Sequence, residues 1–361
     1  MKVLVLGGTG VIGTSLILSL ERAGSEIWVT SRKTLNDRQN VKFLKGDAQD
    51  DQFLSSLLST RWDAIIDFMA YTTPKFLQRF EQLYRATDQY VFLSSCRVFA
   101  ASQTDLDECS PRLLDVCTDP HYLTTDEYGL AKARQEDYIR QSSSTNWTIV
   151  RPYITFGKGR FQLGPLEKED WLYRAVRGRK VVFCKDLMNR TTTLTNSDTV
   201  AGMIASLVGR SEAICNDFNL TSGIGIQWAD ILQTYSAVLR ETLRWTGDVV
   251  LQNLDEFCLH TKPEQVKFDR AYDRRFSTNK IAPFFDLNTI ADPLVDLRAS
   301  FEKQLAGETR FRRINWRAEA LRDKASGEYV DLTDLETLSS LSRYLFFRHV
   351  PVQIMRQMKI V

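Results

Sequence analysis

Short apolar runs alternate with amphipathic stretches from the start of the chain to residue 150. Residues 2–6 are one such run, directly before a cluster of glycines, which is typical of a strand buried on both faces of a parallel sheet. Residues 12–23 then carry apolar side chains at helical spacing up to Gly24, where the predicted helix ends. Further apolar runs predict strands at residues 27–30, 41–44, 64–68, 90–93 and 147–150. This alternation predicts an α/β fold built on a doubly wound parallel sheet.

The pattern changes after residue 152, where glycines, charges and aromatic residues mix. Helical spacing predicts helices at residues 167–176, 196–208, 228–245 and 293–305, and an apolar run predicts a strand at residues 218–220. An arginine-rich tail with helical patches at residues 316–324 and 335–347 follows Gly307. We therefore predict a sheet domain at 1–157, rejoined by 190–222, a smaller α/β lobe at 158–189 and 223–306, and a helical C-terminal extension at 307–361.

Composition and charge narrow the class of protein. The 361 residues carry a formal net charge of +2, which gives no reason to expect nucleic acid or a membrane surface as a partner. No apolar run approaches the roughly 20 residues that span a bilayer, and the start of the chain carries no signal-peptide cleavage pattern. The six cysteines contain no C-x-x-C pair, and the three histidines are scattered, so no metal site is predicted. We expect a cytoplasmic protein that works without a metal.

The segment Gly7-Gly8-Thr9-Gly10-Val11-Ile12-Gly13 joins the first predicted strand to the first predicted helix. Gly7, Gly10 and Gly13 permit a tight turn, close approach of the backbone to a pyrophosphate, and close packing of the helix on the strand. The free N–H groups and the positive dipole end of the helix attract the anion. The motif therefore predicts dinucleotide binding, and a purely structural glycine turn is the alternative. The predicted contacts are Gly7, Thr9, Gly10, Val11, Ile12 and Gly13.

The spacing G-x-x-G-x-x-G resembles that of the short-chain dehydrogenase/reductase superfamily, whose members have a Rossmann-type dinucleotide-binding domain. The resemblance continues at Asp47-Ala48, which look like the family's adenine-contacting segment after the third strand, and at Met69-Ala70, where the family lines the cofactor groove. It extends to Arg151-Pro152, which look like the start of the segment that leads to the substrate lobe. The resemblance covers residues 1–305, loosely after 157. It implies cofactor contacts for Asp47, Ala48, Met69, Ala70 and Pro152.

The end of the second predicted strand bears on the choice of nicotinamide cofactor. An acidic residue at this position holds the ribose 2′-hydroxyl of NAD, but this chain has Thr30-Ser31-Arg32-Lys33. The planar guanidinium of Arg32 suits a 2′-phosphate. We therefore expect Ser31 and Arg32 to bind NADP. The alternative is NAD, bound without an acid and with Arg32 as a solvated loop charge.

Tyr128 and Lys132 have the spacing Tyr-x-x-x-Lys within a predicted helix at residues 125–141, so both side chains share one helix face. Tyr71 and Lys75 repeat the spacing, but Pro74 between them disfavours a regular helix. Ser95 follows the predicted strand 90–93, at the end where open α/β sheets place their sites. A tyrosine needs a nearby cation to act as a base at neutral pH. We predict that Ser95, Tyr128 and Lys132 form a catalytic trio, and that Tyr128 and Lys132 also contact the cofactor. The alternative is that the tyrosine and the lysine are surface residues and the serine is unrelated to them.

The two residues after Ser95 restrict the reaction. Extended members of the superfamily that eliminate water from a sugar carry an Asp-Glu pair there, whereas this chain has Cys96 and Arg97. The resemblance therefore implies oxidation or reduction at one sugar carbon, by an epimerase or by a reductase. Arg190 lies where the family places an arginine on the substrate pyrophosphate, a role that suits its planar fork. An ordinary strand-edge arginine is the alternative.

These residues together predict an NAD(P)-dependent enzyme that acts on a nucleotide sugar in surface-polysaccharide synthesis, with Ser95, Tyr128 and Arg190 against the substrate. A homodimer is implied by the resemblance alone. The alternatives are a non-catalytic protein that binds a dinucleotide or RNA, and an NADP reductase of a small non-sugar ketone. The intact Tyr128 and Lys132 favour an enzyme, and the balanced charge disfavours RNA. For residues 307–361, a helix pair packed on the substrate lobe is favoured over a docking surface for a partner.

Overall fold

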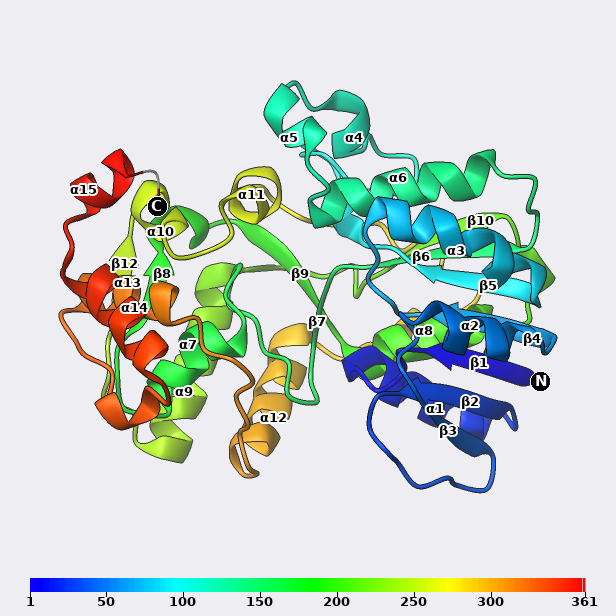
Figure 1. The fold of residues 1–361 in the computed structure, drawn as a ribbon, viewed down its shortest axis with the longest axis horizontal. Coiled ribbons are helices and arrows are strands. Elements are labelled where there is room, and N and C mark those ends of the chain that lie inside the picture. Colours follow the sequence, from blue (N-terminus) through cyan, green and yellow to red (C-terminus); the bar gives the residue numbers. More distant parts are fainter. Residues whose placement is uncertain (359, 361) are drawn as a thin grey trace. The chain divides into compact units, whose positions relative to one another are not determined.

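The computed structural model describes residues 1–358 and 360 (Figure 1). They form two compact units, each assembled from three segments of the chain. The first unit consists of residues 1–158, 193–225 and 274–293, and the second of residues 159–192, 226–273 and those from 294 onward. The sequence placed residues 274–293 in the substrate lobe, and this assignment is corrected.

A parallel sheet of seven strands is the centre of the first unit. Its strands are β1 (Lys2–Leu6), β2 (Glu26–Ser31), β3 (Val41–Lys45), β4 (Trp62–Asp67), β5 (Thr87–Leu93), β6 (Trp147–Pro152) and β10 (Asn216–Leu220). The strand order is β10-β6-β5-β4-β1-β2-β3, and every neighbouring pair is parallel. Open sheets of this kind bind ligands where the order reverses, here between β1 and β4, beyond the carboxyl ends of the strands. The predicted fold class is confirmed.

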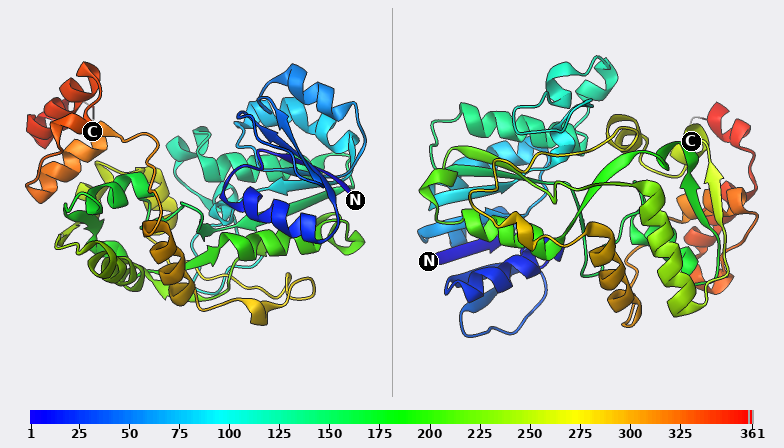
Figure 2. Two further views of the ribbon diagram at one scale, coloured as in Figure 1. Left: turned by 90° about the horizontal axis from the view of Figure 1, so that it is seen from below. Right: turned by 180° about the vertical axis from the view of Figure 1, so that it is seen from behind.

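Helices cover both faces of this sheet (Figure 2). The covering helices are α1 (Val11–Arg22), α2 (Asp51–Leu58), α3 (Thr73–Arg85), α6 (Tyr128–Gln141) and α8 (Ser197–Leu207), and the unit also contains the short helices α4 (Leu113–Val116) and α5 (Pro120–Thr124). Val3 and Val5 belong to the core that α1 and α8 cover, whereas Leu4 and Leu6 belong to the core that α3 and α6 cover. Because both faces are covered, the strands read as continuous apolar runs.

Buried hydrogen bonds hold residues 274–293 in the first unit. The Arg274 side chain is fully buried and donates to the carbonyl oxygens of Phe99 at 3.2 Å and Ala100 at 2.9 Å. The N–H of Leu106 donates to the carbonyl oxygen of Arg275 at 2.8 Å. These bonds join segments far apart in the sequence, so no local pattern could indicate them.

The second unit contains a parallel pair of strands, β8 (Val181–Cys184) and β12 (Val249–Gln252), that the sequence did not predict. Its helices are α7 (Lys168–Ala175), α9 (Trp228–Leu243), α10 (Leu254–Cys258), α11 (Pro263–Gln265), α12 (Pro293–Leu305), α13 (Trp316–Ser326), α14 (Leu338–His349) and α15 (Val352–Gln357). A further sheet has the order β11-β9-β7. Its parallel pairing joins β7 (Ile154–Phe156) to residues 194–196 of β9 (Thr191–Asn196), all in the first unit, and β11 (Gly225–Gln227) is its third strand. Among the described residues, no helix is long and apolar enough to cross a membrane.

Candidate active site

Glycines shape the turn between β1 and α1. Gly7 has a φ of 69°, in the left-handed region that favours glycine, and its N–H donates to the Thr30 hydroxyl at 2.9 Å. A Cβ atom on Gly7 would lie 2.8 Å from Met69 Sδ. A Cβ atom on Gly13 would lie 2.4 Å from the carbonyl oxygen of Gly8, which is backbone and cannot move aside. The turn therefore requires glycine at both positions.

The start of α1 has the features of an anion-binding site. Gly10 precedes the helix with an extended backbone, and none of the described residues lies within 4 Å of the place that a Cβ atom on it would fill. The N–H of Thr14 donates to the carbonyl oxygen of Gly10 at 3.0 Å and so closes the first turn. The N–H groups of Val11, Ile12 and Gly13 precede it and have no acceptor within the helix. A pyrophosphate group fits these donors and this open space.

Other predicted cofactor-binding residues follow the carboxyl ends of neighbouring strands. Ser31 ends β2 and is buried, and its hydroxyl accepts the N–H of Lys33 at 3.1 Å. Arg32, between them, is exposed. Since β3, β2, β1 and β4 are adjacent in the sheet, the loops after them share one edge. The predicted residues at this edge are therefore neighbours in the structure.

The loops after β3 and β4 are joined by a hydrogen bond. Asp47 is exposed and accepts the N–H of Gln49 at 2.9 Å, and the Gln49 amide donates to the carbonyl oxygen of Ala70 at 3.3 Å. This bond holds the two predicted loops against each other at the edge of the sheet. Of the remaining predicted contacts, Thr9 and Ala70 are exposed, Met69 is half-buried, and Ala48 and Pro152 are buried.

The start of α6 packs directly on the turn that follows β5. A Cβ atom on Gly129 would lie 2.7 Å from the carbonyl oxygen of Arg97, so this approach requires glycine. Tyr128 immediately precedes Gly129, and Ser95 immediately precedes the turn, where its hydroxyl accepts the Arg97 N–H at 3.2 Å. The packing therefore brings together the two chain segments that carry Ser95 and Tyr128.

Lys132 lies one helical turn after Tyr128 and is only 3% exposed. Its Nζ atom lies 4.4 Å from the centre of the Phe92 ring on β5, so α6 and β5 meet at this side chain. Burial lowers the pKa of Lys132 to about 8, against the opposing effect of the Asp67 and Glu136 carboxylates. At pH 7 the amine therefore still carries its positive charge.

Two buried carboxylates act on Lys132 through their charge. Asp67, at the end of β4, accepts the N–H of Met69 at 2.9 Å and the hydroxyl of Tyr90 at 2.8 Å, and its burial raises its pKa. Burial also works to raise the pKa of Glu136, but the ion pair with Arg151, at 2.7 Å, outweighs it and the pKa is lowered. Glu136 is thus the fixed negative charge on the Lys132 side of α6.

Arg97 and Glu127 support the Tyr128 ring. The Arg97 guanidinium lies 5.3 Å from the centre of that ring, where a cation is attracted to the aromatic face, and it forms an ion pair with Glu127. Glu127 also accepts the N–H of Gly129 at 2.8 Å and the Tyr122 hydroxyl at 3.0 Å. Tyr128 itself stays 39% exposed, so much of its side chain is accessible from solvent.

These supporting residues were not predicted from the sequence. A signal existed for Glu127, an N-cap residue type directly before Tyr128, and for Glu136, four residues after Lys132 on the same helix face. Asp67 and Phe92 gave no signal, because their strands read only as apolar runs.

Cys96 is fully buried next to Ser95. Its Sγ atom donates to the carbonyl oxygen of Arg151 at 3.0 Å, and burial raises the pKa of the thiol well above its usual range. A thiol in this state is a packing group and neither a base nor a nucleophile at neutral pH. With Arg97 held by Glu127, the two positions after Ser95 supply no acid–base pair.

Arg190 lies in the second unit, whereas the other predicted site residues lie in the first. Its side chain is exposed, its N–H donates to the carbonyl oxygen of Leu187 at 2.9 Å, and its carbonyl oxygen accepts the N–H of Trp228 at 3.2 Å. Its contact with a substrate pyrophosphate stays a prediction. Within residues 1–358 and 360, no group of three or more histidine, cysteine, aspartate or glutamate side chains is arranged to hold a metal ion.

Comparisons with known proteins show which family and which fold the chain resembles. The model of the NAD dependent epimerase/dehydratase family matches residues 3–87. The chain is 23% identical over 237 residues to the chloroplast stem-loop binding protein of 41 kDa b from Arabidopsis thaliana, covering 61% of this chain and 58% of that protein. It is 35% identical over 77 residues to a UDP-glucose 4-epimerase from Lactobacillus helveticus, covering 20% of this chain and 23% of that one. The chain thus spans less than two thirds of the length of either relative.

A solved structure shares the fold over most of the chain. The UDP-glucose 4-epimerase of Thermus thermophilus in complex with NAD superposes with a TM-score of 0.61 and 16% identity, covering 85% of this chain and 99% of that one. At this identity the likeness establishes the fold alone.

Proposed function

We propose that the chain transfers a hydride at one carbon of a nucleotide sugar, as an epimerase or a reductase. The proposal starts from two findings: residues 3–87 match the NAD dependent epimerase/dehydratase family, and the fold is that of the extended short-chain dehydrogenases/reductases. The observation that carries the proposal is the contact of Gly129 with the Arg97 carbonyl group. This contact brings the Tyr128 segment to the strand end that carries Ser95, in the same unit as the glycine turn.

The first unit supplies the cofactor site in this proposal. The α1 N-terminus at Gly10 would hold the pyrophosphate, the loop of Asp47 would meet the adenine, and Arg32 would meet the ribose. The bound nicotinamide supplies the acceptor or donor of the hydride. NADP is the preferred cofactor in our proposal because Arg32 is exposed directly after β2, and NAD, which lacks the 2′-phosphate, needs no cation there.

Each member of the trio has a separate task. The Tyr128 phenolate oxygen would take the proton of the sugar hydroxyl during oxidation, and the hydroxyl that this forms would return the proton during reduction. The Ser95 hydroxyl donates a hydrogen bond to the same sugar oxygen. Lys132 stays protonated at pH 7, and its charge, with that of Arg97, favours a negative charge on the Tyr128 oxygen.

Redox at a single carbon is favoured over elimination of water. Elimination needs an acid and a base beside the reacting carbon, but Cys96 is a buried thiol and Arg97 is paired with Glu127. An epimerase would convert the sugar with no net consumption of cofactor, whereas a reductase would consume the reduced form. We place either reaction in surface-polysaccharide synthesis and propose that the enzyme works as a cytoplasmic homodimer, with Arg190 on the substrate pyrophosphate.

RNA binding is the second candidate, because one relative is named as a stem-loop binding protein. The formal net charge of +2 disfavours this candidate, since RNA binding relies on clustered positive charge. A salt-dependent affinity for RNA hairpins, without turnover of any nucleotide sugar, would favour this candidate over an enzyme.

The test is turnover by the full chain with a panel of nucleotide sugars and with both NAD and NADP, monitored by reduced-nicotinamide absorbance and sugar proton signals. Tyr128→Phe should lower turnover at least about 100-fold, because it removes the proton-transfer group. Tyr138→Phe is the matched control, since Tyr138 lies on the same helix and is also 39% exposed; its turnover should stay unchanged. Equal turnover by Tyr128→Phe and the wild-type enzyme would disprove the mechanism.

A further inference from the structure

A cavity of about 770 Å³ lies within the second unit, in the C-terminal part that the family model does not cover. Its walls come from α7, from the extended segment 311–316, and from the first turn of α14. This volume lies within the roughly 300–1,000 Å³ range of small-molecule sites. The cavity is therefore large enough to hold a metabolite, and its lining indicates which kind.

Arginine dominates the charge of this lining. Four arginines and two carboxylates contribute to it. One of the carboxylates, Asp334, is already engaged, because it forms an ion pair with Arg177 at 2.7 Å and accepts the Tyr173 hydroxyl at 2.6 Å. The cavity therefore has an excess of positive charge. Its arginines are Arg177, Arg312, Arg313 and Arg343.

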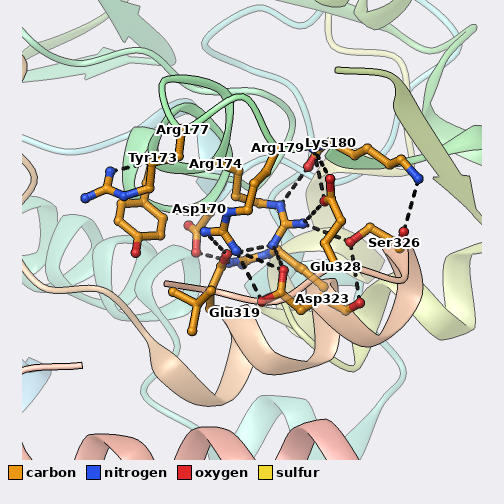
Figure 3. Close-up of polar contacts among 12 residues, drawn as sticks. Asp170, Tyr173, Arg174, Arg177, Arg179, Lys180, Glu319, Asp323, Ser326 and Glu328 are labelled. Atoms are coloured by element: carbon orange, nitrogen blue, oxygen red, sulfur yellow. Dashed lines mark hydrogen bonds and ion pairs between the residues drawn. The ribbon is translucent and has the colours of Figure 1, made fainter. Parts of the chain in front are cut away.

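Other arginines of the same unit are paired with carboxylates, as Figure 3 shows. Arg174 binds Glu319 and Asp323 at 2.6 and 2.7 Å, and Arg179 binds Asp323 at 2.9 Å. The charges of Arg174 and Arg179 are thus neutralised within the protein, and both residues have a structural role. In the described part of the chain, by contrast, no carboxylate pairs with the exposed side chains of Arg312, Arg313 and Arg343.

The first turn of α14 adds further donors to the same cavity. Thr337 caps this twelve-residue helix by accepting the N–H of Ser340 at 3.1 Å. The N–H groups of Leu338 and Ser339 have no acceptor within the helix, and the Ser339 and Ser340 side chains line the cavity. A helix N-terminus with hydroxyl groups beside three unpaired guanidinium groups suits an anion with several oxygen atoms.

Aromatic side chains surround the fourth arginine of the lining, Arg177. Arg177 lies over the Tyr173 ring at 3.9 Å from its centre, and Phe311 and Trp316 meet the same ring edge-to-face, with centres 5.6 and 6.0 Å away. These contacts fix the guanidinium of Arg177 in place before any ligand arrives. A preformed wall lowers the entropy lost on binding.

A smaller cavity of about 360 Å³ lies on the other side of Arg312 and Arg313. Its lining combines the carboxylates of Glu167, Glu169 and Asp170 with the cations of Lys262, Arg317 and Arg322. The two cavities share Arg312 and Arg313, and only the larger one adds Arg343 and the first turn of α14.

We propose that the larger cavity binds a small molecule through a phosphate or diphosphate group, held by Arg312, Arg313 and Arg343 at the N-terminus of α14. Arginine forks bind phosphate oxygen atoms in pairs, and a diphosphate has enough oxygen atoms to engage all three guanidinium groups. The site lies in the other unit from the glycine turn and does not depend on hydride transfer.

The test is isothermal titration calorimetry of the full chain with inorganic pyrophosphate at low ionic strength. Arg313→Ala and Arg343→Ala should each weaken binding at least about tenfold, because each removes charge-assisted hydrogen bonds to the anion. Arg310→Ala is the matched control: this residue stands in the same segment, its side chain is 82% exposed, and it does not line the cavity. Circular dichroism of each variant checks that it is folded.

Pyrophosphate that binds at the glycine turn contributes equally to all of these proteins, because that turn is unchanged in them. The proposal is overturned if the arginine variants and the wild-type protein bind pyrophosphate equally. It is also overturned if Arg310→Ala loses as much affinity as Arg343→Ala, since that result would show an effect of net charge alone.

Discussion

At the scale of single residues, Lys132 carries a positive charge where burial penalises charge. Its pKa falls to about 8, below the ordinary value of about 10.4, because the loss of water around the amine outweighs the attraction of Asp67 and Glu136. The folded chain therefore stabilises Lys132 less well than water does. Residues that destabilise a fold in this way are expected where their chemistry is needed.

We predict that Lys132→Met abolishes turnover and yet makes the chain more stable at pH 7, by on the order of 2 kcal/mol. Below pH 8 the wild-type lysine is protonated in both states, so the penalty is fully present. Between pH 8 and about 10.4 the unfolded chain binds more protons than the folded one, so wild-type stability rises with pH and the difference shrinks.

Urea unfolding at pH 7, 8, 9 and 10, followed by circular dichroism, measures this difference. Lys42→Met serves as the control, because Lys42 is a lysine of the same unit whose side chain is exposed, so its removal relieves no burial of charge. A Lys132→Met protein that is less stable than the wild-type protein at pH 7 would contradict the burial argument.

At the scale of elements, two glycines of the same motif have different structural roles. Gly13 lets α1 approach the backbone of Gly8, whereas Gly10 keeps a space open in front of the helix. The second Tyr-x-x-x-Lys copy illustrates the same dependence on context, because α3 begins at Thr73 and so excludes Tyr71. An identical residue type or spacing thus has a different role in each element.

We predict opposite effects for alanine at these two glycines. Gly13→Ala should destabilise the first unit by about 1–3 kcal/mol, because its Cβ atom would overlap a backbone carbonyl group. Gly10→Ala should leave the free energy of unfolding nearly unchanged and weaken binding of the reduced cofactor at least about tenfold, because the methyl group would occupy the pyrophosphate position. Urea unfolding and a fluorescence titration with NADH and NADPH measure the two effects. Unchanged cofactor affinity in Gly10→Ala would place the pyrophosphate elsewhere.

At the scale of the whole molecule, the C-terminal extension is an integral part of the second unit. Arg174 of α7 is fully buried, and its ion pairs reach Glu319, Asp323 and Glu328 of the extension (Figure 3). Tyr344 of α14 donates to Asp323 at 2.6 Å and so adds the next helix to the same cluster. Such buried charges are costly when one partner is missing.

We predict that Arg174→Ala lowers the free energy of unfolding by about 3–5 kcal/mol, because it leaves buried carboxylates without their counter-charge. Arg177→Ala is the control, since the Arg177 side chain is 34% exposed and its pair with Asp334 should be worth at most about 1 kcal/mol. Urea unfolding gives both values, and limited proteolysis should cut the second unit first in Arg174→Ala. Equal shifts in the two variants would contradict the structural role of the cluster.

The sequence by itself determined the elements whose residues interact locally. The apolar runs gave β1 through β6, and helical spacing gave α1, α6 and α12, because strand burial and helix faces leave periodic signals. The glycine turn and the Tyr128–Lys132 spacing could also be recognised from the sequence, because the residues of each lie within one element or one turn. The four-residue strands β8 and β12 were not predicted, because they lie after residue 152, where the alternation of apolar runs and amphipathic stretches ends.

Only the tertiary structure decided the contacts between distant segments. It joined Gly129 to the Arg97 carbonyl group, returned residues 274–293 to the first unit, and gathered the carboxylates around Arg174. Burial, ion pairs and pKa shifts depend on which groups displace water from one another in space. Sequence spacing carries no information on such neighbours, so these features became visible only in the folded chain.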